Sequence, residues 1–179
     1  MKEFRVKITG VAPLRMNRLT EETKESVGKG SVKLDDKAKI TEAWSRAYKN
    51  KEGEYAIEGQ AIKACFLKGA AKVKLGRGKA KNDMKAILYT KQKEIVLQYE
   101  KEPYLITIPC KIPPRTGMLA LKHFPTFDTW SAEFDLIITD DRFPDNALEQ
   151  SIIEAGMYAG LLDGRPDYGR FILTKFERV

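Results

Sequence analysis

Residues 3–9 alternate strictly between apolar and polar side chains, and this pattern restricts the folds open to the chain. Phe4, Val6 and Ile8 would point to one side of an extended segment, and charged or hydroxyl side chains would point to the other. A period of two over this length predicts a strand with one buried face and one solvated face. We therefore expect a sheet that other elements cover on one face only.

Apolar residues at helical spacing predict two helices that can cover such a sheet. One stripe runs through residues 60–74, and a second begins at Asp145, whose side chain we expect to cap its helix. Further strands are expected over 95–99, 104–110, 131–139 and 170–177, with the first two paired as a hairpin. This order predicts an α+β, ferredoxin-like β-α-β-β-α-β core, in which an antiparallel sheet carries its helices on one face.

The remaining segments read as insertions into one domain that spans residues 1–179. The core is expected at about 3–10, 55–110 and 131–179, and the insertions at about 15–54 and 111–130. The first insertion, which contains a short amphipathic helix at 37–49, is long for a connection and therefore indicates a functional segment. The second is rich in proline and predicts a loop or a projecting hairpin.

The region between the first helix and the third strand is harder to assign from its pattern. Residues 75–83 are polar, basic and glycine-containing, so we expect a flexible loop there. Residues 85–90 fit a strand and a helix equally well.

Charge is unevenly distributed along this basic chain, whose formal net charge is +7. Residues 60–93 contain one acid, Asp83, and the cations Lys63, Lys68, Lys72, Lys74, Arg77, Lys79, Lys81, Lys85, Lys91 and Lys93. Residues 133–154 contain one cation, Arg142, and the acids Glu133, Asp135, Asp140, Asp141, Asp145, Glu149 and Glu154. We expect one cationic and one anionic face, and a cationic face suits the phosphates of a nucleic acid. A solvated lysine surface without a partner is the alternative.

Cysteine and histidine are too scarce for several kinds of site. Cys65 and Cys110 are far apart in sequence and are expected to be reduced thiols, and His123 is the single histidine. We expect no metal site, no cofactor and no histidine-based catalytic triad. No apolar run is long enough to cross a bilayer and the first residues read directly as a strand, so a soluble, cytoplasmic protein is expected.

Glycines 156, 160, 164 and 169 mark the junction between the second helix and the last strand. Glycine-rich turns that carry arginines, here Arg165 and Arg170, can present amide groups and guanidinium groups to phosphates. Asp163 and Asp167 are expected to be turn residues that pair with these arginines. A helix end with tight packing explains the same glycines without a ligand.

These elements resemble the RAMP superfamily of CRISPR-associated proteins. Its signature is a glycine-rich loop between the last helix and the last strand, and the run YAIEGQAIKACFLKGAA resembles the segment that introduces its first core helix. Gly59 and Lys63 match that segment, whereas Glu58 stands where a proline is common. The resemblance covers residues 3–10, 55–75 and 131–177. The 163–171 run also resembles small proteins of phages and archaeal elements.

The resemblance is nearest to the backbone subunits that polymerise along guide RNA. It implies an RRM-like core, a large insertion after the first strand, a protruding hairpin and assembly as repeated subunits in a ribonucleoprotein. We expect sequence-independent binding of single-stranded RNA or DNA, with RNA favoured. The residues expected to contact phosphates are Lys63, Lys68, Lys72, Arg77, Lys79, Lys81, Arg165 and Arg170.

Aromatic side chains near basic residues are candidates to stack on bases. We expect this role for Phe124 and Phe127, with Tyr48 and Trp130 as further candidates and Trp44 as a core residue.

Two other functions remain open at this point. A RAMP-type endoribonuclease would use His123, or Asp35 and Asp36 with a metal ion; a histidine without a catalytic role and an inert acidic pair are the alternatives. A protein–protein interaction or inhibitor module would use the basic face to block a partner. We expect a binding protein without catalytic activity.

Overall fold

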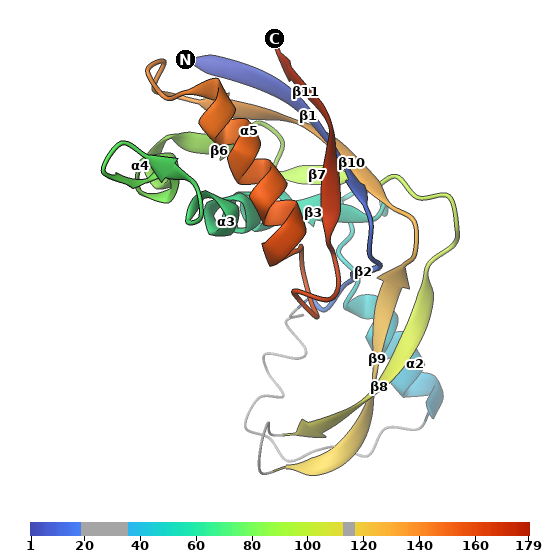
Figure 1. Ribbon diagram of the computed structural model, residues 1–179. Helices are drawn as coiled ribbons and strands as arrows, with labels where there is room; N and C mark the ends of the chain where they lie inside the picture. Colours follow the sequence, from blue (N-terminus) through green and yellow to red (C-terminus); the bar gives the residue numbers. More distant parts are fainter. Residues whose placement is uncertain (19–35, 113–116) are drawn as a thin grey trace.

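The computed structural model describes residues 1–18, 36–112 and 117–179. Its main sheet is antiparallel, with the strand order β11-β1-β10-β6. The four strands are β1 (Lys2–Gly10), β6 (Leu88–Thr90), β10 (Ser131–Ile138) and β11 (Phe171–Arg178). The strands from the two ends of the chain, β1 and β11, thus lie side by side, with β11 at one edge of the sheet (Figure 1).

Two helices pack together on one face of this sheet. They are α3 (Gly59–Ala70) and α5 (Asp145–Glu154), and a π-helical turn, η1 (Ala155–Ala159), continues α5. Phe4, Val6 and Ile8 are at most 1% exposed on the helix-covered face, whereas their neighbours in β1 are partly or fully exposed. The period of two therefore predicted the buried face of β1 correctly.

The core elements follow one another as β1, α3, β6, β10, α5 and β11. This order is consistent with the β-α-β-β-α-β pattern expected from the sequence. The strand between α3 and β10 is the three-residue β6, which falls in the segment that the pattern left ambiguous.

The predicted hairpin of residues 95–99 and 104–110 is wrong. The strand β7 (Glu94–Val96) pairs with β3 (Ala56–Glu58), and β8 (Tyr104–Ile112) pairs with β9 (Met118–Phe127). Ile95 and Leu97 are buried in the hydrophobic core, so this segment packs with the main domain and not with the projecting hairpin. A polar turn between two apolar runs indicates that the chain bends, but it does not specify which strands pair.

The β8–β9 hairpin projects away from the main sheet, at the lower end of the molecule in Figure 1. With β2 (Leu14–Arg15) it forms a second sheet, and α2 (Asp36–Ser45) packs against β9. The projecting part therefore combines both predicted insertions, and its hairpin begins at Tyr104, earlier in the chain than the expected boundary at 111.

The segment expected to be a flexible basic loop is ordered. It forms β4 (Lys74–Leu75), β5 (Gly78–Lys79) and α4 (Ala80–Ile87). Ala80 and Met84, one helical turn apart, are fully buried and hold α4 against the core. A single apolar pair among lysines is a weak signal in the sequence, but it is enough to anchor a short helix.

The expected cap at the start of α5 is also wrong. Pro144 occupies the cap position, and the Asp145 carboxylate accepts a hydrogen bond of 2.6 Å from Lys2 Nζ. Asp145 thus connects α5 to β1 and does not satisfy the first amide groups of its own helix.

The helices α3 and α5 touch through their backbones at Gly69. A Cβ atom built on Gly69 would lie 2.1 Å from the Ser151 carbonyl oxygen and 2.5 Å from the Ala155 nitrogen. Any larger side chain would therefore force the helices apart. This contact fixes the position of the end of α3 relative to η1.

We predict that Gly69→Ala lowers the free energy of unfolding. Overpacking costs about 1–3 kcal/mol, which exceeds the gain of roughly 0.5–1 kcal/mol from replacing a glycine within a helix. Urea denaturation followed by circular dichroism measures the change. Gly78→Ala is the control, because the nearest atom that its Cβ would meet beyond the adjoining residues is the Leu75 carbonyl oxygen, at 3.8 Å. Equal denaturation midpoints for the two variants would contradict the close helix contact.

Candidate functional site

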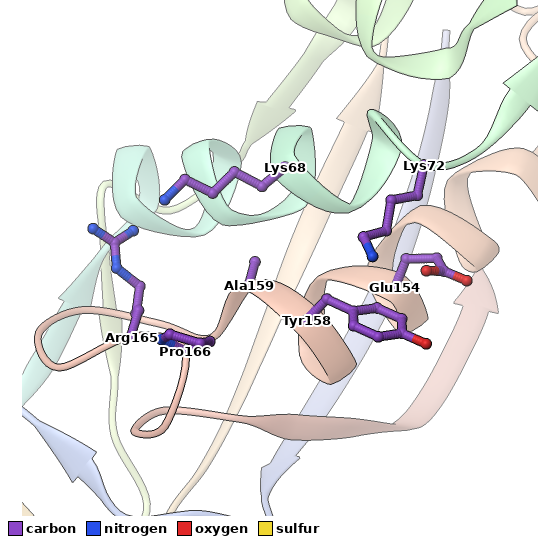
Figure 2. A pocket seen from close by; sticks show the side chains of 7 residues that line it. All are labelled: Lys68, Lys72, Glu154, Tyr158, Ala159, Arg165 and Pro166. Carbon is purple, nitrogen blue, oxygen red and sulfur yellow. The ribbon is translucent and has the colours of Figure 1, made fainter.

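A hollow of about 340 Å³ lies between the end of α3, the π-helical turn η1 and the glycine-rich turn that follows it. Figure 2 shows its side chains converging from these segments. The hollow is lined by Lys68, Lys72, Glu154, Tyr158, Ala159, Arg165 and Pro166.

The geometry of α3 brings the two lysines to the hollow. Lys68 lies in the last turn of α3, and Lys72 lies in the turn that follows the end of the helix; both side chains line the hollow. The Lys72 ammonium lies 3.5 Å from the centre of the Tyr158 ring. Tyr158 is 52% exposed, so its ring is available at the surface. The hollow thus combines an aromatic face with cations.

The glycine-rich turn, residues 160–170, is closed by its own backbone. The Leu161 amide donates to the Gly169 carbonyl at 2.9 Å, and the φ angle of Gly169 is +70°. A Cβ atom on Gly169 would lie 2.1 Å from the Leu161 oxygen, so only glycine fits this position. The Cys65 thiol, on α3, donates a hydrogen bond of 3.2 Å to the Gly160 carbonyl. The turn is therefore fastened to the helix that supplies Lys68.

Arg15 fastens the other side of the same turn. Its Nε donates to the Asp163 carboxylate at 2.8 Å, and its guanidinium lies 4.5 Å from the ring centres of both Phe124 and Tyr168. The pairing expected from the sequence, between Asp163 and Arg165 or Arg170, is therefore wrong. Arg165 is exposed and forms no ion pair within residues 1–18, 36–112 and 117–179. Figure 2 shows its guanidinium on the same side of the hollow as the Lys68 ammonium.

The acidic segment 133–154 and the basic segment 60–93 differ in how many of their charges form ion pairs. Five of the seven acids of 133–154 are paired with cations, so the expected anionic face is not a surface of unpaired acids. Glu133 pairs with Lys175, Asp135 with Arg5, Asp140 with Arg142, Asp141 with the N-terminus, and Asp145 with Lys2 and Arg178. In the described part of the chain, the cations from Lys63 to Lys85 form no ion pair, and only Lys91 of the basic segment does, with Glu3. The positive charge along α3 and α4 is therefore not neutralised by ion pairs among the described residues, although Glu154 lines the hollow and Asp83 lies in α4.

The other predicted phosphate contacts lie outside the hollow. Lys63 sits over the Tyr89 ring at 4.3 Å. Arg77, Lys79 and Lys81 are exposed on β4, β5, α4 and the turns between them, and Arg170 is exposed at the entrance to β11. The fold brings Lys68, Lys72 and Arg165 together and distributes the rest along neighbouring surface.

The predicted stacking aromatics do not fit their positions. Phe124 is 4% exposed and Phe127 is fully buried. Phe127 packs edge-on against Tyr55 and Tyr99, because it lies on the inward side of β9. Trp130 is 3% exposed and donates its indole hydrogen to the Ala12 carbonyl, so it too belongs to the core. Stacking of bases on these side chains is therefore excluded in this fold.

The sequence analysis missed Tyr158. Its only local signal is an exposed position at the end of a helical stripe, next to Met157, which is 51% exposed. The π-helical turn sets its direction, and no spacing rule predicts such a turn.

The residues of the nuclease alternative are not assembled by the described part of the chain. His123 lies on β9, and its Nδ1 shares a hydrogen bond of 2.8 Å with the Thr107 hydroxyl. Asp35 lies outside the described residues, as does the side chain of Asp36. Among the described residues, no group of three or more His, Cys, Asp or Glu side chains is placed to hold a metal ion. No described helix is long and apolar enough to cross a membrane.

The comparisons with known proteins give similarity at the level of the fold. No protein-family model matches the chain, and no curated protein matches it. Among solved structures, 64 chains match. One comes from the structure described as "Cryo-EM structure of the Type III-B Cmr-beta bound to cognate target RNA", with a TM-score of 0.59 and 13% sequence identity. The alignment covers 99% of this chain and 60% of that chain, so the two share a fold over part of the longer protein.

We predict that Cys65 reacts far more slowly with thiol reagents than Cys110. Burial raises the pKa of the Cys65 thiol to about 12, so almost no thiolate is present at pH 8. Cys110 is only half-buried. Ellman's reagent should give one fast thiol in the folded protein, and both thiols should react in denaturant. The Cys110→Ser variant should lose the fast phase. A fast phase that persists would show that the contact between Cys65 and the turn opens readily.

Proposed function

We propose that this protein binds single-stranded nucleic acid, with RNA favoured, at the hollow between α3 and the glycine-rich turn. The observation that carries the proposal is the convergence of Lys68, Lys72 and Arg165, which form no ion pair in the described part of the chain, around the exposed ring of Tyr158. Cations that lack carboxylate partners gain most from phosphates, because each phosphate they neutralise releases condensed counterions.

The arrangement inside the hollow divides the roles of its side chains. Glu154 lies at the end that holds Lys72 and Tyr158, whereas Lys68 and Arg165 lie at the other end (Figure 2). The Glu154 carboxylate repels a phosphate, so a phosphate is favoured beside Lys68 and Arg165. A base then lies over the face of the Tyr158 ring that the Lys72 ammonium does not cover, and such a ring face can stack with any base. Binding of this kind is independent of sequence.

Cations outside the hollow extend the same surface. Lys63 lies in the first half of α3, nearer its start than Lys68. Arg77 lies in the turn before β5, Lys79 lies in β5, and Lys81 lies in α4. Arg170 is the last residue of the glycine-rich turn, directly before β11. These side chains are proposed as additional, weaker phosphate contacts.

The open face of the main sheet is a poorer candidate for the nucleic acid. Three of its cations are held by acids: Arg5 with Asp135 at 3.0 Å, Lys91 with Glu3, and Lys175 with Glu133 at 3.3 Å, which leaves Lys7 as a cation without an ion pair among the described residues of this face. A face on which charges are paired has little net attraction for phosphates. This argues against binding in the manner of an ordinary RRM, where aromatic side chains on the sheet stack the bases.

We further propose that the protein acts as a repeated subunit along the strand, in a CRISPR-associated ribonucleoprotein of the cytoplasm. Two observations support this step. The glycine-rich turn occupies the position that the RAMP resemblance implies, between α5 with η1 and β11. The fold is shared with a chain of a Type III-B Cmr-beta structure that is bound to target RNA. We propose a binding role without cleavage, because His123 is held by Thr107 in the hairpin, away from the residues of the hollow.

We predict that Lys68→Gln, Lys72→Gln and Arg165→Gln, combined, weaken binding of single-stranded RNA by roughly tenfold or more and flatten its salt dependence by roughly 2 in the logarithmic slope. Fluorescence anisotropy at several salt concentrations measures both. The matched control changes Lys7, Lys91 and Lys175 to Gln, which removes the same charge from the open sheet face. An equal loss in both variants would mean that net charge alone, and not the hollow, attracts the strand.

We predict that binding strengthens with strand length beyond what one subunit can cover. Labelled RNA and DNA of about 10 and about 40 nucleotides are compared, since one small domain covers roughly 4–16 nucleotides. Repeated subunits should bind the longer strand cooperatively and more tightly per nucleotide, with RNA preferred. Simple independent binding would argue against repeated subunits. No binding of either nucleic acid would overturn the proposed function and favour a protein–protein module.

A further inference from the structure

A second group of cations lies at the base of the projecting hairpin, outside the hollow. It consists of Arg15 in β2, Arg18 just after it, Arg46 at the end of α2 and Lys122 in β9. The nearby acids are Glu42 and Asp163, and each already serves one arginine: Arg46 bonds to Glu42, and Arg15 bonds to Asp163. Lys122 and Arg18 form no ion pair within the described residues.

Lys122 is the unusual member of this group. Its side chain is half-buried beneath α2, and its ammonium lies 5.2 Å from the centre of the Phe124 ring. The titratable groups that face it are Arg46, Asp163, Cys110 and Glu42. Burial lowers the pKa of Lys122, and the positive charge of Arg46 lowers it further. An ammonium taken out of water without a counterion is costly, so this position favours an anion from outside.

We propose that Lys122, Arg46 and Arg18 form a second phosphate site at the base of the hairpin, which takes a backbone phosphate of the strand that is bound at the hollow. This inference rests on the proposed function for its ligand, because an oxyanion of another source fits the same cations. Arg15 is not part of the site, since its guanidinium is held between two rings as well as by Asp163, whereas the Arg46 guanidinium bonds to Glu42 through its Nη2 atom.

The glycine-rich turn connects the two sites. Asp163 faces Lys122 and Arg15 on one side of the turn, and Arg165, two residues later, lines the hollow on the other. Burial raises the pKa of Tyr48, as do Glu58 and Asp163, whereas Arg18 and Arg165 lower it. The Arg18 guanidinium lies 5.9 Å from the centre of the Tyr48 ring. In the proposed arrangement, a strand that leaves the hollow past Arg165 reaches Arg18 and then Lys122.

The first test measures the affinity of the Lys122→Gln variant for a short and for a long RNA strand. RNA of about 4 nucleotides fits the hollow alone, whereas RNA of about 16 nucleotides spans both sites. Lys122→Gln should leave short-strand affinity unchanged, lower long-strand affinity about threefold to tenfold and reduce the salt slope by roughly 0.7. Lys122→Arg, which keeps the charge, should restore binding. Lys111→Gln on the exposed side of β8 is the control and should change neither.

The outcomes separate this inference from the proposed function. If the wild-type protein binds the long strand and Lys122→Gln binds it equally well, the second site is overturned and the hollow stands. If the wild-type protein binds neither strand, the proposed function fails first. A thermal melt of each variant shows whether a loss of binding comes from unfolding.

The second test follows the protonation of Lys122 itself by the NMR shift of its Cε carbon. Bound phosphate should raise the pKa of Lys122 from its lowered value, and long RNA should do so where short RNA does not. Inorganic phosphate is the probe for a free anion. A rise with inorganic phosphate, together with unchanged long-strand affinity in Lys122→Gln, would identify a small-anion site and overturn the assignment to nucleic acid.

Discussion

The contact between α3 and α5 at Gly69 is the constraint on which the site depends. Because the helix backbones touch there, the end of α3 is held against the π-helical turn that follows α5. Lys68 and Lys72 flank Gly69 in sequence, and Tyr158 lies on that turn. A wider separation of the helices would move the Lys72 ammonium off the Tyr158 ring, 3.5 Å away, and open the hollow. A residue without a side chain thus sets the geometry of side chains that carry charge.

The distribution of ion pairs decides which of the many cations are available to a ligand. The acids between β10 and α5 are used to hold the sheet and the start of α5 to the two ends of the chain. They therefore do not neutralise the lysines of α3 and α4. The net charge of +7 does not reveal this, because it is a total and does not say where the unpaired cations lie. Exposed ion pairs contribute little to stability, but they remove cations from competition for phosphate.

Arg15 joins the two parts of the molecule. Through β2 it belongs to the sheet of the hairpin, and through Asp163 it holds the glycine-rich turn beside the main helices. Its guanidinium fills the space between Phe124 and Tyr168, where a planar cation gains from both rings. The hollow and the base of the hairpin are consequently held in one arrangement, as the proposed binding of one strand at both sites requires.

The sequence by itself determined the local properties of this protein. The alternation around Phe4, Val6 and Ile8 fixed which face of β1 is buried, and the stripes at 60–74 and from 145 fixed the two covering helices, because periodicity depends only on neighbours along the chain. The basic segment and the position of the glycine-rich turn were readable for the same reason. The tertiary structure alone decided the partners: that residues 94–96 pair with β3, that Asp163 binds Arg15, that Phe124 and Phe127 are buried, and that Tyr158 is exposed beside Lys72. Pairing and burial depend on segments that are distant in sequence, and no local pattern encodes which of them meet.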